Sequence, residues 1–139
     1  MATWIPQRPA TGRLHREQQS TAMLAIGQSA TLTFSALGRA GILVAASCSQ
    51  LAWFTLYSSE AARNADGERL ITTDPETSSG VLLDAVLEAG QELLLPPGCT
   101  YFNAEDPGEA LLYGLVRRHS GSGGAAALTV QLRAMVLAL

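Results

Sequence analysis

The chain has 139 residues, of which 47% are hydrophobic and only 15% charged, with a formal net charge of −3 and a pI of about 5.3. This length and composition suit one folded domain with a sizeable core, and they exclude a disordered tail or a coiled coil. All nine basic residues are Arg. They form no basic stripe, which argues against a nucleic-acid-binding protein.

Residues 1–28 differ from the rest of the chain, because they carry two prolines, little apolar content and no sustained period. We expect an extended N-terminal docking arm here, with a short helical piece near residues 14–19. The candidate partner-binding residues of the arm are Trp4, Ile5 and Arg8. A lone Trp on a polar arm often anchors in a pocket of another protein. Packing of Trp4 against its own domain fits the sequence equally well.

The domain proper is expected over residues 29–139. Residues 29–35 alternate between apolar and hydroxyl side chains, which predicts a half-buried strand of an antiparallel sheet. Glycines then bracket a turn into the apolar run 42–46, which predicts a buried strand just before Cys48.

The stretch 50–75 is the most informative part of the chain. Aromatic and β-branched residues predict a strand, with Phe54 on one face and Trp53, Thr55 and Tyr57 on the other. Two serines then cap a run, 61–65, that is too short for more than one or two helical turns. Asp-Gly ends the turn, and Thr-Asp-Pro marks the next bend. A capped crossover in a strand-rich chain predicts two packed sheets.

Further strands are predicted over 80–88, 92–95, 99–102 and 110–118. Residues 125–139 fit both a strand period and a helical stripe. The β-branched pair Thr129 and Val130 and the preceding Gly-Ser hairpin favour a strand. Seven or eight short strands predict an all-β, antiparallel β-sandwich of the jelly-roll or immunoglobulin-like kind.

Motifs for catalysis or cofactor binding are not found in the sequence. His15 and His119 stand in no metal-ligand spacing, and there is neither a phosphate-binding loop nor a G-x-S-x-G elbow. Cys48 and Cys99 are expected to be buried free thiols, with a disulfide as the alternative. No signal peptide and no apolar run of roughly 20 residues is visible. We therefore expect no enzyme, no cofactor, no metal and no membrane partner.

One set of charged residues stands out: Arg63, Asp66, Arg69 and Asp74. Arg63 and Asp66 are three residues apart on the predicted helical turn and are expected to pair. The structural interpretation of the set is an ion-pair network that fixes the crossover on the sheet. A ligand-binding site is the less favoured interpretation.

Several segments resemble a small β-sandwich module of virion and tail-associated proteins of tailed bacteriophages, including cyanophages. The segments are 56–69 (LYSSEAARNADGER), 73–75 (TDP), 80–84 (GVLLD), 116–121 (VRRHSG) and 128–132 (LTVQL). The likeness spans roughly residues 29–133 and leaves the arm unmatched. It implies a structural role in the virion, in the tail fibre or baseplate, and it identifies no catalytic residues.

The favoured hypothesis is therefore a non-enzymatic virion protein that forms a homo-oligomer, most plausibly a trimer, and docks on other virion proteins by its arm. The low charge supports it, because a lone copy would expose much apolar surface. One alternative is a capsid decoration protein. Another is a carbohydrate-binding module that recognises a host glycan. The aromatic candidates for that module are Trp53, Tyr57, Tyr101 and Tyr113.

Overall fold

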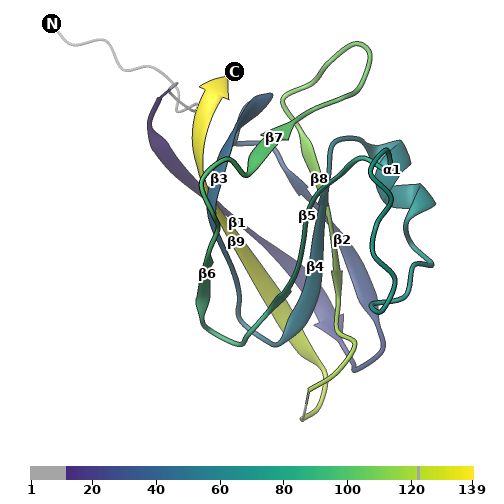
Figure 1. The fold of residues 1–139 in the computed structure, drawn as a ribbon. Coiled ribbons are helices and arrows are strands. Elements are labelled where there is room, and N and C mark those ends of the chain that lie inside the picture. The colour runs from purple at the N-terminus through teal and green to yellow at the C-terminus, as the bar shows by residue number, and fades with distance from the viewer. Residues whose placement is uncertain (1–11, 122) are drawn as a thin grey trace, which may run out of the picture.

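The computed structural model describes residues 12–121 and 123–139, and it shows two antiparallel sheets packed face to face (Figure 1). The first sheet has the order β1-β9-β3-β6, and β7 also pairs with β3. Its strands are β1 (Leu14–Leu24), β9 (Ala126–Ala138), β3 (Ala40–Cys48), β6 (Glu92–Leu94) and β7 (Thr100–Phe102). The second sheet has the order β2-β8-β4-β5. Its strands are β2 (Ser29–Phe34), β8 (Leu112–Arg117), β4 (Ala52–Tyr57) and β5 (Val81–Leu87).

The prediction of an all-β sandwich with a short helical crossover is confirmed. The first four strands alternate between the two sheets, and β8 and β9 return to lie beside β2 and β1. This interleaving is the strand order of a jelly roll, whereas an immunoglobulin sandwich keeps β1 and β2 in one sheet. The single described helix, α1 (Glu60–Ala65), lies on the outside of the second sheet (Figure 1).

The predicted boundary at residue 28 is wrong, because Leu14–Leu24 is a strand of the sandwich and not part of an arm. It pairs with β9 from Leu14 opposite Met135 to Leu24 opposite Ala126. The helical piece expected near residues 14–19 is wrong for the same reason. Residues 1–11 lie outside the described part of the chain, and with them Trp4, Ile5 and Arg8.

Strand β1 escapes recognition in the sequence because most of its inward positions, before the buried Leu24, are polar. Glu17 faces inward and is only 8% exposed. Its carboxylate accepts hydrogen bonds from the backbone N–H groups of Ser35 (3.0 Å) and Ala36 (2.8 Å). This edge strand is therefore held by backbone pairing and a buried carboxylate rather than by an apolar face.

The core lies between the sheets and is built from the inward positions of each strand. In β4 these are Ala52, Phe54 and Leu56, and the ring of Phe54 meets Phe34 edge-on at 6.1 Å. The ambiguous segment 125–139 is the strand β9, as predicted. Its inward residues are fully buried, which stabilises the fold by about 2 kcal/mol for each large aliphatic side chain. They are Leu128, Val130, Leu132, Ala134 and Val136.

Both cysteines are free thiols, so the alternative of a disulfide is wrong. Cys48 is buried and Cys99 half-buried, and desolvation raises the pKa of each thiol. Within the described residues, no helix has the length and hydropathy needed to cross a membrane.

Candidate functional site

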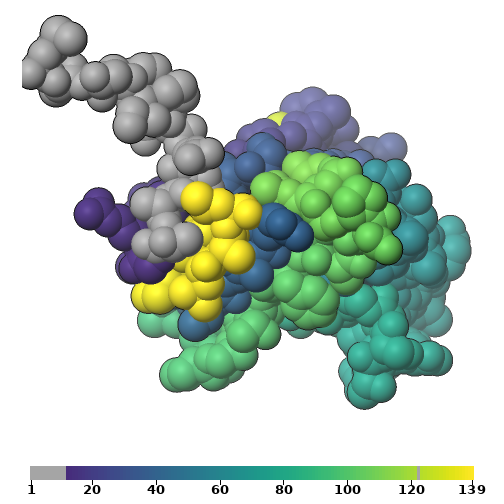
Figure 2. Space-filling view, turned by 90° about the horizontal axis from the view of Figure 1, so that it is seen from above, coloured from purple at the N-terminus to yellow at the C-terminus, as the bar shows by residue number. Residues whose placement is uncertain are grey.

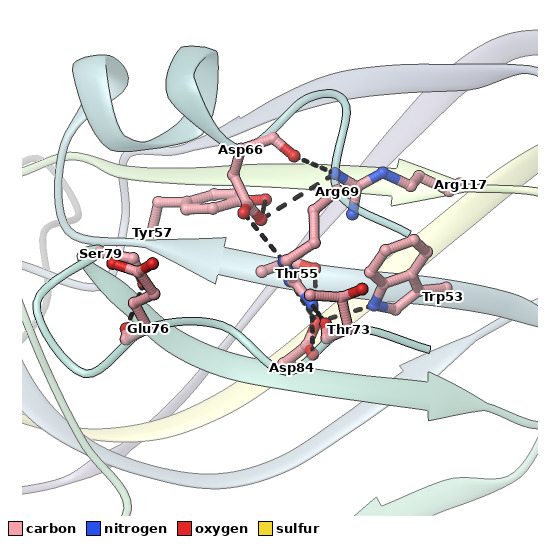
Figure 3. A network of polar contacts seen from close by, with 10 residues as sticks. All are labelled: Trp53, Thr55, Tyr57, Asp66, Arg69, Thr73, Glu76, Ser79, Asp84 and Arg117. Atoms are coloured by element: carbon pink, nitrogen blue, oxygen red, sulfur yellow. Dashed lines mark hydrogen bonds and ion pairs between the residues drawn. The ribbon is translucent and has the colours of Figure 1, made fainter. Parts of the chain in front are cut away.

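The outer face of the second sheet carries polar and aromatic side chains that are nevertheless buried. Trp53, Thr55 and Tyr57 point outward from β4, yet their exposed fractions are 4%, 0% and 0%. They are buried because the chain between β4 and β5, which contains α1, crosses over this face. Ser59 caps the start of the helix, and its side chain accepts a hydrogen bond from Ala62 N (3.1 Å). Figure 3 shows how the crossover is fastened to the strands below it.

Asp84 of β5 is the first of two carboxylates that hold the crossover. It accepts hydrogen bonds from Trp53 Nε1 (2.7 Å) and Thr55 Oγ1 (2.8 Å). Arg69 binds both of its oxygens, with Nη1 and Nη2 each at 3.1 Å. Desolvation opposes ionisation of Asp84, but these hydrogen bonds outweigh it and lower the pKa of the carboxyl group. Asp84 is therefore a fixed anion at neutral pH.

Asp66, directly after α1, is the second carboxylate. It accepts hydrogen bonds from Tyr57 Oη (2.6 Å) and Arg69 Nε (2.8 Å). Arg117 of β8 donates to the backbone oxygen of Asp66 (2.7 Å), and its Nη2 lies 3.9 Å from the carboxylate. Burial, and then the bond to Asp66, raises the pKa of Tyr57 to about 12. The bond to Asp66 also raises the pKa of Arg69, even though desolvation lowers it.

The indole of Trp53 contacts two guanidinium groups. The carbon Cζ of Arg117 lies 3.9 Å from the ring centroid and that of Arg69 lies 5.0 Å from it. Such cation–π contacts are worth roughly 1–2 kcal/mol each where water is excluded. We call these side chains together the crossover clamp. The crossover clamp consists of Trp53, Thr55, Tyr57, Asp66, Arg69, Asp84 and Arg117.

The crossover clamp is suited to holding a segment in place rather than to chemistry on a substrate. Both carboxylates are surrounded by donors, the carboxyl group of Asp84 has a lowered pKa and is ionised, and the phenol of Tyr57 stays protonated far above neutral pH. A general acid or base needs a pKa near the working pH, and neither Asp84 nor Tyr57 has one. Nη1 of Arg117 is buried without a hydrogen-bond acceptor among the described residues, and its guanidinium stacks on Trp53.

An open groove of about 380 Å³ lies beside the crossover clamp. Exposed Leu70 and Ile71 line it from the crossover, and Arg118 and His119 line it from the chain after β8. Arg118 Nη1 donates to the backbone oxygens of Leu24 (2.7 Å) and Gly124 (2.8 Å). The cations around this groove are thus engaged in holding the chain, as those of the crossover clamp are.

The structure separates the four charged residues singled out in the sequence. Asp66 and Arg69 lie together in the crossover clamp. The expected pair of Arg63 with Asp66 is wrong, because Arg63 Nη1 donates to the backbone oxygen of Leu32 (3.1 Å) and its guanidinium lies 5.2 Å from the ring of Tyr113. Asp74 is exposed and has no hydrogen bond or ion pair among the described residues.

Sequence reasoning missed Asp84 as the true partner of Arg69. The sequence signal that could have identified Asp84 was its position on the polar face of the predicted strand 80–88. In the structure Asp84 stands directly opposite Thr55 in the pairing of β4 with β5. That register depends on the crossover length and cannot be read from either segment alone.

The four aromatic residues considered for sugar binding are all buried. Trp53, Tyr57, Tyr101 and Tyr113 expose at most 5% of their surface. Tyr101 and Tyr113 donate their hydroxyl hydrogens to Leu37 O (2.7 Å) and Glu105 Oε1 (2.6 Å). None of the four rings offers a free face for stacking against a sugar.

The outer face of the first sheet is different, because no helix or strand of the described residues packs over it (Figure 1). We call it the bare face. Where the sheet reaches the end of β9, Leu14, Met135 and Ile42 lie side by side across three strands. Leu14 is 54% exposed, and Ile42 and Met135 are half-buried. Further toward the other end the outward residues are mainly polar, and Arg133 binds Glu92 at 2.8 Å.

No group of three or more His, Cys, Asp or Glu side chains that could hold a metal ion exists within residues 12–121 and 123–139. Comparison with protein-family models and with curated proteins yields no match. The functional argument therefore rests on the residues themselves.

Proposed function

We propose that this chain is a non-enzymatic structural subunit of a tailed-phage virion that assembles with copies of itself through the bare face. The observation that carries the proposal is the difference between the two sheets. The second sheet is covered by its own crossover, which the crossover clamp holds down. The first sheet presents Leu14, Ile42 and Met135 on its outer side, and no helix or strand of the described residues packs over them (Figure 1).

Exposed apolar side chains in one contiguous patch mark interaction surfaces in soluble proteins. A stable interface must bury on the order of 800 Å² per partner, and the outer face of the five-stranded first sheet is large enough to supply that area. Identical copies most often close into rings or dimers about a symmetry axis. We favour a trimer, in which the bare faces meet around one axis and the covered faces point outward.

The setting in a phage tail fibre or baseplate is supported by the resemblance of residues 29–133 to phage sandwich modules. In that setting the N-terminal segment with Trp4, Ile5 and Arg8 docks on a neighbouring subunit of the virion. A capsid decoration protein would use the same kind of assembly. A glycan-binding role has less support, because the four aromatic side chains that it needs are buried.

Light scattering with size-exclusion chromatography tests the assembly. We expect an oligomer for the full chain and a folded monomer for Met135→Arg, which places a charge in the middle of the apolar row formed by Leu14, Met135 and Ile42. Val86→Arg is the matched control, since Val86 is an exposed apolar residue of β5 on the other sheet, and this variant should remain an oligomer. A wild-type monomer at micromolar concentration would contradict the proposal.

Incorporation into particles tests the setting. Deletion of residues 2–11 should leave the sandwich and its oligomer intact but reduce incorporation, as measured by mass spectrometry of purified virions. Residues 12–28 must be retained, because β1 belongs to the first sheet.

A further inference from the structure

A second groove, of about 680 Å³, opens at the end of the molecule where β9 ends. It lies between the start of α1, the turn before β5 and the end of β7. Its lining is entirely uncharged: Ser59, Thr77, Ser78 and Ser79 supply hydroxyl groups around it, and apolar side chains that include Leu82 and Phe102 complete it. We call it the hydroxyl-rimmed groove.

The hydroxyl-rimmed groove and the start of β1 lie at the same end of the sandwich but at opposite sides of it. Gly12 N donates to Val136 O (2.6 Å), so the chain enters the sandwich beside the end of β9. Phe102 pairs with Ala40, which also pairs with Ala138 near the same end of β9. Figure 2 shows this end from above, with β1 (purple) on one side and the crossover (teal) on the other.

We propose that residues 1–7 of one copy dock into the hydroxyl-rimmed groove of a neighbouring copy, an inference that rests on the proposed self-assembly. Eleven residues precede Gly12 and span up to about 36 Å when extended. Because donor segment and acceptor groove stand at opposite edges of one end, a ring of identical copies brings each donor next to the following acceptor. Docking in the same chain would instead require the segment to cross the full width of that end (Figure 2).

Charge supports this pairing of segment and groove. Residues 1–7 (MATWIPQ) carry no charged side chain, and they include Trp4 and Ile5 as apolar anchors. The first charged side chain after the segment is that of Arg8. Exposed Glu60 and Glu76 flank the hydroxyl-rimmed groove, directly beside Ser59 and Thr77. The groove beside the crossover clamp is the poorer acceptor, since arginines line it and would repel Arg8.

The hydroxyl groups of the groove also suit an indole. A buried Trp needs an acceptor for its Nε1–H, and the side chains of Ser59, Thr77, Ser78 and Ser79 provide several. The Trp4 ring would pack on Leu82 and Phe102. This contact would cover the 48% of Phe102 that a single copy leaves exposed.

Site-directed disulfide formation tests the proposal in the full chain. Ala2→Cys is combined with Ser78→Cys in a Cys99→Ser background, with buried Cys48 retained. The matched control replaces Ser78→Cys by Thr72→Cys, an exposed hydroxyl residue of the crossover outside the hydroxyl-rimmed groove. We expect covalent dimers and larger species on a non-reducing gel, with a yield about tenfold above that of the control, because docking raises the local concentration of the two thiols.

The anchor is tested by adding Trp4→Ala, which should reduce the cross-link to the level of the control, whereas Gln7→Ala should not. An intramolecular disulfide, identified by peptide mapping of the monomer band, would overturn docking between copies. An oligomer by light scattering without any cross-link above the control would overturn this inference while leaving self-assembly intact. A monomer without a cross-link would overturn both.

Discussion

The substitution Asp84→Asn tests whether the crossover clamp holds the covered face together. The amide oxygen of Asn can still accept from Trp53 and Thr55. The Asn side chain cannot accept both hydrogen bonds that Arg69 donates to the two carboxylate oxygens at 3.1 Å, because its NH₂ group would face the guanidinium. A hydrogen bond between charged groups contributes about 1.5–3 kcal/mol. Since the side chain of Asp84 is 24% exposed and partly screened, we expect a loss of about 2 kcal/mol in the free energy of unfolding at pH 7.

The pH dependence of this loss has a definite sign. The pKa of Asp84 is lowered from its ordinary value of 3.8 by folding, so the unfolded chain binds the proton more tightly. The contribution of the charged form is therefore fully present above the ordinary pKa and is lost as the pH falls through the folded pKa. The difference between wild type and Asp84→Asn should shrink accordingly below about pH 4.

Chemical denaturation followed by fluorescence, at one fixed protein concentration, measures the difference. In thermal unfolding the same change corresponds to about 8 °C in Tm. Asp74→Asn is the matched control, because Asp74 is exposed on the same crossover and should change stability by less than about 0.5 kcal/mol. Equal stability of the two variants at pH 7, or a loss that persists unchanged in acid, would refute the reasoning.

Three further predictions concern the core, the phenol of the crossover clamp and the bare face. Gly41→Ala should lower the free energy of unfolding by about 3 kcal/mol, since the new methyl group would clash with the backbone of β9 and the hydroxyl of Tyr101. Gly124→Ala is the control, because its methyl group would meet no other atom, and denaturation curves should show no change in stability. Tyr57→Phe should cost about 1 kcal/mol at pH 7 by loss of the bond to Asp66. Because the folded pKa of Tyr57 is raised to about 12, its contribution is lost as the pH rises from about 10 through 12, so this variant should show a shallower alkaline decline in stability. Assembly through the bare face should change little in light scattering between about 0.1 and 1 M salt, because apolar contacts are not screened; dissociation by salt would indicate a charged interface instead.

Most strands of the sandwich are predictable from the sequence because their inward residues are apolar and alternate. The segment 125–139 is an example of a strand that the alternation predicts, since Leu128, Val130 and Leu132 fit the strand period and are fully buried in β9. Strand β1 is an example of a strand that the alternation does not predict. Its inward residues include Glu17, and its place in the sheet comes from pairing with β9, more than 100 residues further along the chain.

The candidate site divides in the same way between local and non-local contacts. Asp66 and Arg69 are three residues apart, so their proximity follows from the local turn. The contacts of Arg69 with Asp84 and Trp53 depend on how the crossover returns to the sheet. Arg63 has the same spacing to Asp66 as Arg69 has, but it lies on the opposite side of the turn and binds Leu32 O instead.

The distribution of charge over the two outer faces explains why the crossover stays packed on the second sheet, whereas the bare face of the first sheet stays available for a partner. With only 15% charged residues, the chain places two arginines and two aspartates in the crossover clamp, where they bind one another. On the bare face Arg133 is paired with Glu92, and Arg16 stands directly opposite Arg133 in register. Like charges facing each other across two strands destabilise a free sheet. The bare face therefore carries an electrostatic conflict between Arg16 and Arg133, which Glu92 offsets in part, whereas the opposite charges of the crossover clamp bind one another.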